Sequence, residues 1–218
     1  MSDNKILINA LKTLDLNQHA TISDIKQRYF ERTGQSRFKM IFLNDESTKR
    51  DFLKYHEAYV IAMREFQNEH PDVTMDYYPP HQVFNLLFNQ GIYFLIKDNL
   101  IKAGQKFEEA ERLKSDHVLT KLYLGILLMK RKNYYAAEKY FNKAVKHEND
   151  NSDAWYYLGY NYMKAGQFQK AGDAFFKSKE LNPFRKDILE ARKELQNLSS
   201  GKSGDKEKSI FKKIFGKK

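Results

Sequence analysis

The stretch that decides the fold is WYYLGYNYMKAGQFQKAGDAFFKSKELNP, from Trp155 to Pro183. Its apolar residues recur at intervals of three and four on both sides of Ala165-Gly166, which predicts two helices joined by a turn. Gly159 is small where the two helices must approach closely, and Phe175 supplies the bulk that fills the gap between them. Pro183 ends the second helix because it has no N–H to donate and clashes with the preceding turn.

The same residue types recur every 34 residues toward the N-terminus. Three positions keep this interval through three copies: Gly91, Gly125 and Gly159; Ala103, Ala137 and Ala171; Phe107, Phe141 and Phe175. We therefore predict repeats at 84–117, 118–151 and 152–185, and a helix at 185–198 that caps the open end of the stack. The unit resembles the tetratricopeptide (TPR) repeat, a helix–turn–helix of the same period. This resemblance implies an all-α fold containing a three-repeat TPR α-solenoid.

The composition narrows the classes of protein to which the chain can belong. With 218 residues, 41% of them apolar, the chain has room for one large or two small domains with a real core. It has no cysteine, which excludes disulfides and thiolate metal sites. We find neither the pattern of a signal peptide nor a long apolar run typical of a membrane-spanning helix. We therefore expect a cytoplasmic protein, or one that is peripheral at the inner face of a membrane.

The formal net charge is +10, and half of this excess lies in residues 201–218. The remainder of the chain shows no basic stripe, so we do not expect nucleic-acid binding. We predict a flexible basic tail at 199–218, in which a helix would place four apolar side chains opposite the lysines. Three alternatives stay open for this tail: it is disordered, it rests on an anionic membrane surface, or it lays its apolar side chains into a groove of the repeats. The residues concerned are Ile210, Phe211, Lys212, Lys213, Ile214 and Phe215.

Residues 1–69 are predicted to form a small domain of three helices. Thr21 is typical of an N-cap, with Asp24 three residues on as a variant of the capping box. The second helix is expected to end near Gly34, and the third to begin around Ser47-Thr48. The pattern resembles a J-domain, the module by which Hsp40-type co-chaperones engage Hsp70. The segments that carry this resemblance are Leu14-Asp15-Leu16, Ala20 to Tyr29, and Glu57-Ala58-Tyr59.

The chain departs from this family at the motif on which the family's activity rests. That motif is a His-Pro-Asp tripeptide in the loop between the second and third helices. Counted from Tyr29, its place is held by Arg37, Phe38 and Lys39, which reverses the local charge. His70-Pro71-Asp72 comes after the third helix and is expected to be an ordinary part of a linker at 70–83, where Pro79-Pro80 is expected to be non-helical. The resemblance then implies a degenerate J-like domain that docks on Hsp70 at most, without stimulating its ATPase.

The functional surface that the TPR resemblance implies is the concave groove lined by the first helix of each repeat, over residues 84–198. Nine apolar or aromatic residues occupy the groove positions. We expect them to bind an apolar peptide or a partner helix, with the alternative that some of them pack between helices. The residues are Phe88, Ile92, Leu95, Leu122, Ile126, Met129, Tyr156, Tyr160 and Met163. The positions at which related domains grip the C-terminal carboxylate of Hsp70 or Hsp90 hold no cation here, so such a clamp is not expected.

Nothing in the sequence indicates an enzyme, a metal site or a cofactor. The six histidines show no metal-ligand spacing, and no glycine-rich loop suited to phosphate is present. We therefore expect a non-catalytic, chaperone-related adaptor or scaffold. Two other functions stay open: an active Hsp40-type co-chaperone for Hsp70, and a membrane-surface scaffold anchored by the tail.

Overall fold

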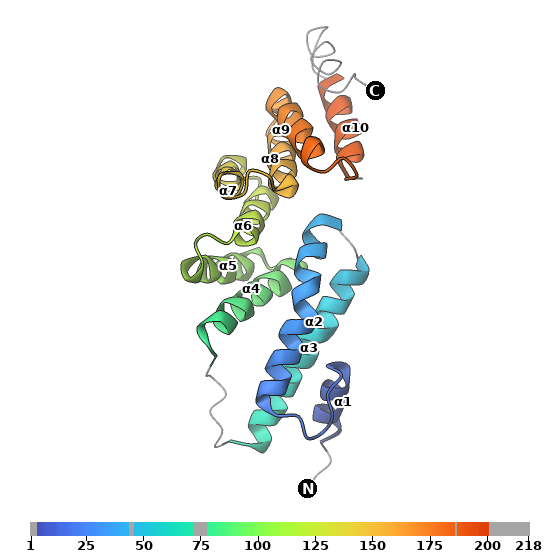
Figure 1. The fold of residues 1–218 in the computed structure, drawn as a ribbon, viewed down its shortest axis with the longest axis vertical. Helices are drawn as coiled ribbons and strands as arrows, with labels where there is room; N and C mark the ends of the chain where they lie inside the picture. Colours follow the sequence, from blue (N-terminus) through green and yellow to red (C-terminus); the bar gives the residue numbers. More distant parts are fainter. Residues whose placement is uncertain (1–3, 44–45, 72–77, 186, 201–218) are drawn as a thin grey trace. The chain divides into compact units, whose positions relative to one another are not determined.

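The computed structural model describes residues 4–43, 46–71, 78–185 and 187–200, and the elements in these ranges are helices (Figure 1). The fold is all-α and of the TPR type, as the repeats predict. The chain divides into two compact units, Met1–Leu113 and Lys114–Lys218. The first repeat thus groups with the N-terminal helices, whereas the sequence suggests a boundary at 70–83.

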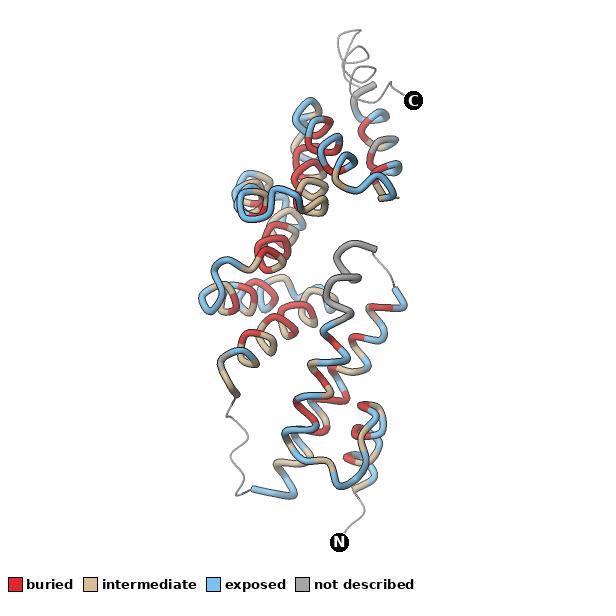
Figure 2. The backbone as a smooth tube through the Cα atoms, viewed as in Figure 1, coloured by how far each residue is buried: buried red, intermediate tan, exposed pale blue. Residues whose placement is uncertain are grey.

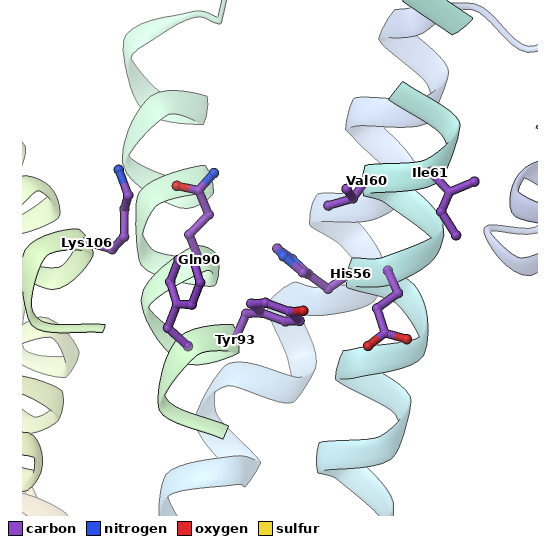
Figure 3. Close-up of a pocket in the computed structure, with 8 residues that line it drawn as sticks. His56, Val60, Ile61, Gln90, Tyr93 and Lys106 are labelled. Carbon is purple, nitrogen blue, oxygen red and sulfur yellow. The ribbon is translucent and has the colours of Figure 1, made fainter. Parts of the chain in front are cut away.

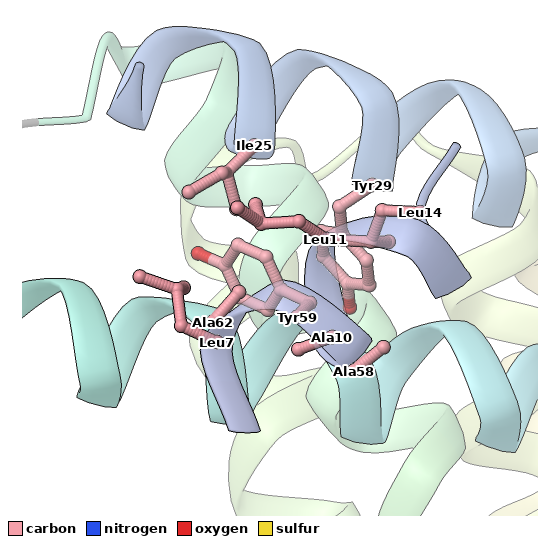
Figure 4. Close-up of a cluster of buried hydrophobic side chains, with 9 residues drawn as sticks. All are labelled: Leu7, Ala10, Leu11, Leu14, Ile25, Tyr29, Ala58, Tyr59 and Ala62. Atoms are coloured by element: carbon pink, nitrogen blue, oxygen red, sulfur yellow. The ribbon is translucent and has the colours of Figure 1, made fainter. Parts of the chain in front are cut away.

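The first unit begins with three helices, α1 (Lys5–Thr13), α2 (Ile22–Leu43) and α3 (Glu46–Glu69). Their buried side chains meet in one cluster, in which the rings of Tyr29 and Tyr59 stack with centroids 4.0 Å apart (Figure 4). Burial of such aromatic and leucine side chains is the main stabilising contribution to a helical domain of this size. The other members of the cluster are Leu7, Ala10, Leu11, Leu14, Ile25, Ala58 and Ala62.

The start of α2 confirms the predicted capping box. The hydroxyl of Thr21 accepts a hydrogen bond from the backbone N–H of Asp24 at 3.2 Å, and a carboxylate oxygen of Asp24 accepts one from the N–H of Thr21 at 2.8 Å. Two N–H groups at the helix start are therefore satisfied reciprocally. The hydrogen bonds that the Asp24 carboxylate accepts from the backbone N–H and from the hydroxyl of Thr21 lower the pKa of this carboxyl below its ordinary value.

The predicted end of α2 near Gly34 is wrong, because the helix continues to Leu43. A single glycine weakens a helix by about 1 kcal/mol relative to alanine but does not terminate it. As a result Arg37, Phe38 and Lys39 lie within α2 and not in a loop. The connection to α3 falls at residues 44–45, which are outside the described residues.

The first repeat consists of α4 (Pro80–Ile96) and α5 (Leu100–Leu113). The expectation that Pro79-Pro80 is non-helical is wrong for Pro80, which occupies the first turn of α4, with Pro79 as the N-cap. A proline fits there because the first N–H groups of a helix have no partner within it.

The second unit continues the repeats with α6 (Val118–Lys130) and α7 (Tyr134–His147), then α8 (Ser152–Lys164) and α9 (Phe168–Leu181). It ends with α10 (Asp187–Ser200), at the place predicted for the capping helix. Buried residues form a stripe along each helix (Figure 2). On α10 the stripe is Ile188, Ala191 and Leu195, which have the spacing of one helical face.

Each repeat is closed by the contact that its sequence predicts between a glycine and a phenylalanine. A Cβ added at Gly91 would lie 2.6 Å from the ring of Phe107, one at Gly125 would lie 2.5 Å from Phe141, and one at Gly159 would lie 2.8 Å from Phe175. All three rings are buried. The ring of the second helix therefore occupies the space that a side chain on the first helix would need.

The turn inside each repeat has one residue with positive φ, again at an interval of 34 positions. These residues are Asp98, Lys132 and Gly166, with φ values of 56°, 59° and 74°. In the second repeat the N–H of Asn133 donates to the carbonyl of Leu128 at 2.9 Å, and the N–H of Lys132 donates to Met129 at 2.9 Å. This pair of bonds is the Schellman motif, which satisfies the last carbonyls of a helix.

The N-terminal helices contact α4 on the face that α8 presents to the preceding repeat. Asn89 of α4 donates to the hydroxyl of Thr33 on α2 at 2.8 Å, and Tyr93 of α4 stacks on His56 of α3 at 4.5 Å between centroids. The equivalent positions of α8 are Tyr157, which stacks on Phe141 of α7 at 6.1 Å, and Asn161, which donates to the Tyr134 carbonyl at 3.0 Å. In the first unit, α2 and α3 therefore cover the repeat as the second helix of a preceding repeat would.

Candidate protein-interaction faces

The structure divides the nine predicted groove residues into two groups. Phe88, Ile92, Leu122 and Met163 are only 0–1% exposed, so the prediction that they contact a partner is wrong. Phe88, for example, packs its ring against Phe107 of the same repeat, with centroids 5.6 Å apart. The first helix of a repeat contacts both its own second helix and its neighbours, and these residues fill that core.

The other five residues are half-buried and keep part of their surface accessible. In the second unit, four of them lie on the neighbouring helices α6 and α8. Tyr156 and Tyr160 are one helical turn apart, and their rings lie nearly parallel with centroids 6.2 Å apart. We call the set Ile126, Met129, Tyr156 and Tyr160 the α6–α8 face. The fifth residue is Leu95, on α4 in the first unit.

Cations from two places contact the tyrosines of the α6–α8 face. The guanidinium of Arg185, in the segment between α9 and α10, lies 4.0 Å from the ring centroid of Tyr156. The ammonium of Lys164 lies 5.0 Å from the ring centroid of Tyr160 and 2.6 Å from the carboxylate of Glu194 on α10. These contacts hold the aromatic rings in place, and cation–π pairs of this kind contribute about 0.5–2 kcal/mol each.

Arg185 is the residue that sequence reasoning missed. It pairs with the carboxylates of Asp153 and Asp187, and only 6% of its side chain is exposed. Burial raises the pKa of the Asp153 carboxyl, and the charge of Arg185 opposes this rise. Burial also raises the pKa of the Tyr156 hydroxyl above its ordinary value. The signal in the sequence was the position of Arg185, at the predicted start of the capping helix.

The clamp positions for a terminal carboxylate are occupied as the sequence suggests, by groups unsuited to it. Tyr123 is buried, and Tyr157 stacks on Phe141 in the core between α7 and α8. Asp153 is negative and already holds Arg185.

A cavity of about 580 Å³ lies in the first unit, lined by residues of α3, α4 and α5 (Figure 3). His56 projects from α3 toward Tyr93 of α4, with Gln90 and Lys106 at the other side of the space. His56 is buried, its Nδ1 lies 2.7 Å from the hydroxyl of Tyr29, and burial lowers its pKa to about 4. Because the lining comes from three helices, no single stretch of sequence could have indicated this cavity.

The other predicted site residues are not brought together with these faces. Arg37, Phe38 and Lys39 lie within α2, as described above. His70 follows α3, is exposed, and stacks on Phe66 at 4.3 Å between centroids, while Asp72 is outside the described residues. The tail residues Ile210, Phe211, Lys212, Lys213, Ile214 and Phe215 also lie outside the described residues.

Two searches of the described residues bear on other kinds of site. They contain no group of three or more His, Asp or Glu side chains that could hold a metal ion. None of the helices within them is both long enough and apolar enough to cross a membrane.

Comparison with known proteins supports the TPR fold. A family model described as the tetratricopeptide repeat matches residues 128–195. No curated protein matches the chain.

Solved structures of TPR domains also resemble the chain. The first TPR domain of human RPAP3 has a TM-score of 0.53 at 14% identity, over 56% of this chain and 96% of that one. The Arabidopsis OM64 TPR domain has a TM-score of 0.52 at 18% identity, over 55% and 98%. The second TPR domain of human RPAP3, solved in complex with the HSP70 peptide SGPTIEEVD, has a TM-score of 0.50 at 19% identity, over 57% and 100%. These likenesses show an all-α TPR fold.

Proposed function

We propose that the chain is a non-catalytic adaptor that holds an apolar peptide or helix of a partner protein against the α6–α8 face. The observation that carries this proposal is that Ile126, Met129, Tyr156 and Tyr160 are only half-buried and keep part of their surface accessible on two adjacent helices. A partner that covers these apolar side chains gains roughly 25 cal/mol for each Å² removed from water. The tyrosine hydroxyls add hydrogen bonds at the edge, as is usual for aromatic residues in interfaces.

The partner that suits this face differs from the peptide in the RPAP3 complex. That peptide, SGPTIEEVD, ends in acidic residues and a free carboxylate. The clamp positions of this chain carry Asp153 and tyrosines instead of cations. We therefore expect SGPTIEEVD to bind weakly or not at all. Isothermal titration measures the affinity of the chain for this peptide. Binding at micromolar concentrations would contradict the proposal of an apolar partner.

The test of the adaptor function compares substitutions on and off the face. Tyr156→Asp and Ile126→Asp place a charge on the α6–α8 face, and we expect each to abolish capture of the partner in a pull-down. Tyr135→Asp and Phe176→Asp are matched controls, because these apolar side chains are 72% and 45% exposed on the second helices of their repeats. Circular dichroism confirms that all four variants are folded. Partners retained by both face variants would refute the proposal.

We also propose that residues 1–69 form a J-like domain without its catalytic tripeptide. Three helices with a capping box at Thr21 and packed tyrosines support this, and the connection between α2 and α3 reads Asn44-Asp45. Because no His-Pro-Asp stands between these helices, we expect docking on Hsp70 at most. An Hsp70 ATPase assay tests this, and clear stimulation would favour the alternative of an active co-chaperone.

The proposal also covers the location of the protein and the role of its basic tail. We place the adaptor in the cytoplasm, with contact between the basic tail at 201–218 and an anionic membrane as the alternative to a disordered tail. Deleting 201–218 and measuring sedimentation with anionic liposomes tests this contact. Loss of binding on deletion would favour a membrane-surface scaffold, and no binding by the full chain would remove that role.

A further inference from the structure

A groove in the first unit, separate from the α6–α8 face, runs between α1 and α3. Its volume is about 640 Å³, and its floor and walls include apolar residues of both helices. Ile6 of α1 is 56% exposed, while Leu53 and Ile61 of α3 are half-buried. The cavity of Figure 3 adjoins this groove, because both are lined by Glu57 and Ile61. A single exposed isoleucine is ordinary on a protein surface, so it is the apolar set of Ile6, Leu53 and Ile61 that marks this groove as a candidate interaction surface.

Cations outnumber carboxylates around this surface. Arg50, Lys54 and Lys97 line the groove, and Lys106, whose ammonium lies 2.8 Å from the carboxylate of Glu109, lines the adjoining cavity. Among the residues that line either space, Glu57 is the one carboxylate, and it lies 3.2 Å from the ammonium of Lys97. An apolar floor with a cationic rim is complementary to a ligand that is apolar on one side and acidic on the other.

The length of the groove suits a short helix. Along α3 its lining extends from Arg50 to Ile61, which corresponds to a length of about 16 Å at the rise of an α-helix. This length accommodates about three turns of a second helix.

We propose that this α1–α3 groove binds an acidic amphipathic helix of a partner protein. The apolar side of that helix lies on Leu53, Ile61 and Ile6, and its carboxylates meet the cationic rim. The groove would then be a second docking site on the adaptor, independent of the α6–α8 face. Electrostatic attraction of this kind accelerates association and weakens as salt screens it.

The proposal can be tested by fluorescence anisotropy with the full chain and a designed peptide. The probe is a labelled helical peptide of about sixteen residues, longer than the groove by one turn, with leucines along one face and glutamates elsewhere. We expect saturable binding that weakens with added salt. A peptide of the same composition with its leucines scattered around the helix, and one with lysines in place of the glutamates, should not bind.

Charge reversal at the rim separates the groove from general attraction to a basic protein. Arg50→Glu with Lys54→Glu should weaken binding about tenfold. The matched control is Lys143→Glu with Lys146→Glu on α7, which makes the same change in net charge and should leave binding unchanged. Both pairs are exposed, and Ile6→Ser provides an uncharged variant of the apolar floor that should also weaken binding.

Three results of the peptide experiments would overturn the proposal. They are the absence of saturable binding by the leucine–glutamate peptide, equal loss of affinity in the control pair, and affinity that neither the rim pair nor Ile6→Ser changes. Sedimentation with phosphatidylserine vesicles tests whether an anionic membrane binds this surface in place of an acidic helix. Vesicle binding that depends on Arg50 and Lys54, without peptide binding, would assign the surface to a membrane and overturn the proposal. Loss of a partner in Tyr156→Asp alone would report on the α6–α8 face. It would not change the result expected for peptide binding in the α1–α3 groove.

Discussion

At the residue scale, each repeat depends on a glycine that lies directly against an aromatic ring. Gly125→Ala puts a Cβ 2.5 Å from the ring of Phe141, which is fully buried and cannot move into solvent. We expect the variant to lower the free energy of unfolding by about 1–3 kcal/mol, the usual cost of overpacking. Urea denaturation followed by circular dichroism measures the change.

The control for this prediction is a glycine with open space around it. Gly34 lies within α2, with nothing within 4 Å of an added Cβ. Gly34→Ala should therefore raise the free energy of unfolding, by about 0.5–1 kcal/mol, because alanine favours the helix. Equal effects of the two substitutions would show that helix propensity, and not the ring contact, governs these positions.

His56 makes the stability of the first unit depend on pH. Its pKa falls from the ordinary 6.5 to about 4 in the folded chain, chiefly because it is buried. Between these values the unfolded chain binds a proton that the folded chain does not. The contribution of neutral His56 to the free energy of unfolding is therefore complete above pH 6.5 and is lost as the pH falls toward 4. We expect the free energy of unfolding to decrease by about 2 kcal/mol between pH 7 and pH 5.

This pH dependence can be isolated with His56→Gln, which cannot be protonated. Denaturation of both proteins at pH 7 and pH 5 gives the difference due to His56, since Tyr29 and Glu57 beside it are present in both. A variant that loses as much stability as the natural chain would contradict the assignment.

At the element scale, the turn after the first helix of each repeat requires one residue in the left-handed region. The third repeat uses Gly166, but the second uses Lys132 at φ 59°. A side chain strains this conformation, so Lys132→Gly should raise the free energy of unfolding by about 0.5–1 kcal/mol. Thermal denaturation measures it. Lys132→Ala keeps the Cβ, and an equal gain in that variant would point to the lost charge instead.

The repeats could be predicted from the sequence because each depends on local spacing. Gly159 and Phe175 identify the close approach of α8 and α9 at an interval that recurs in the chain. The end of α2 could not be predicted from Gly34, because one weak helix former does not outweigh the remainder of a 22-residue helix.

The candidate site was predicted less completely. Periodicity shows that Leu122 and Tyr156 occupy the first helix of a repeat, but it does not say which side of the helix its neighbours cover. Leu122 is buried and Tyr156 is only half-buried. Arg185 reaches the ring of Tyr156 from another element, which residue spacing within a repeat cannot reveal.

At the scale of the whole molecule, the first repeat depends on helices that precede it in the chain. A fragment of residues 80–218 lacks α2 and α3, and so exposes the faces of Asn89 and Tyr93 on α4. We expect faster amide hydrogen exchange in α4 and α5 of this fragment than in the full chain, because buried contacts set local stability. Exchange in α8 and α9 should not change. Unaltered protection of α4 would show that residues 84–198 fold independently of the N-terminal helices.

In the first unit α2 and α3 cover α4 where the second helix of a preceding repeat would lie, and in the second unit α10 covers α8 and α9. A hairpin stacked on either of these covered faces would have to displace a helix of this chain. Within the repeats the 34-residue interval of the positive-φ residues Asp98, Lys132 and Gly166 is kept. Duplication of 118–151 would enlarge the protein while leaving both of its ends intact.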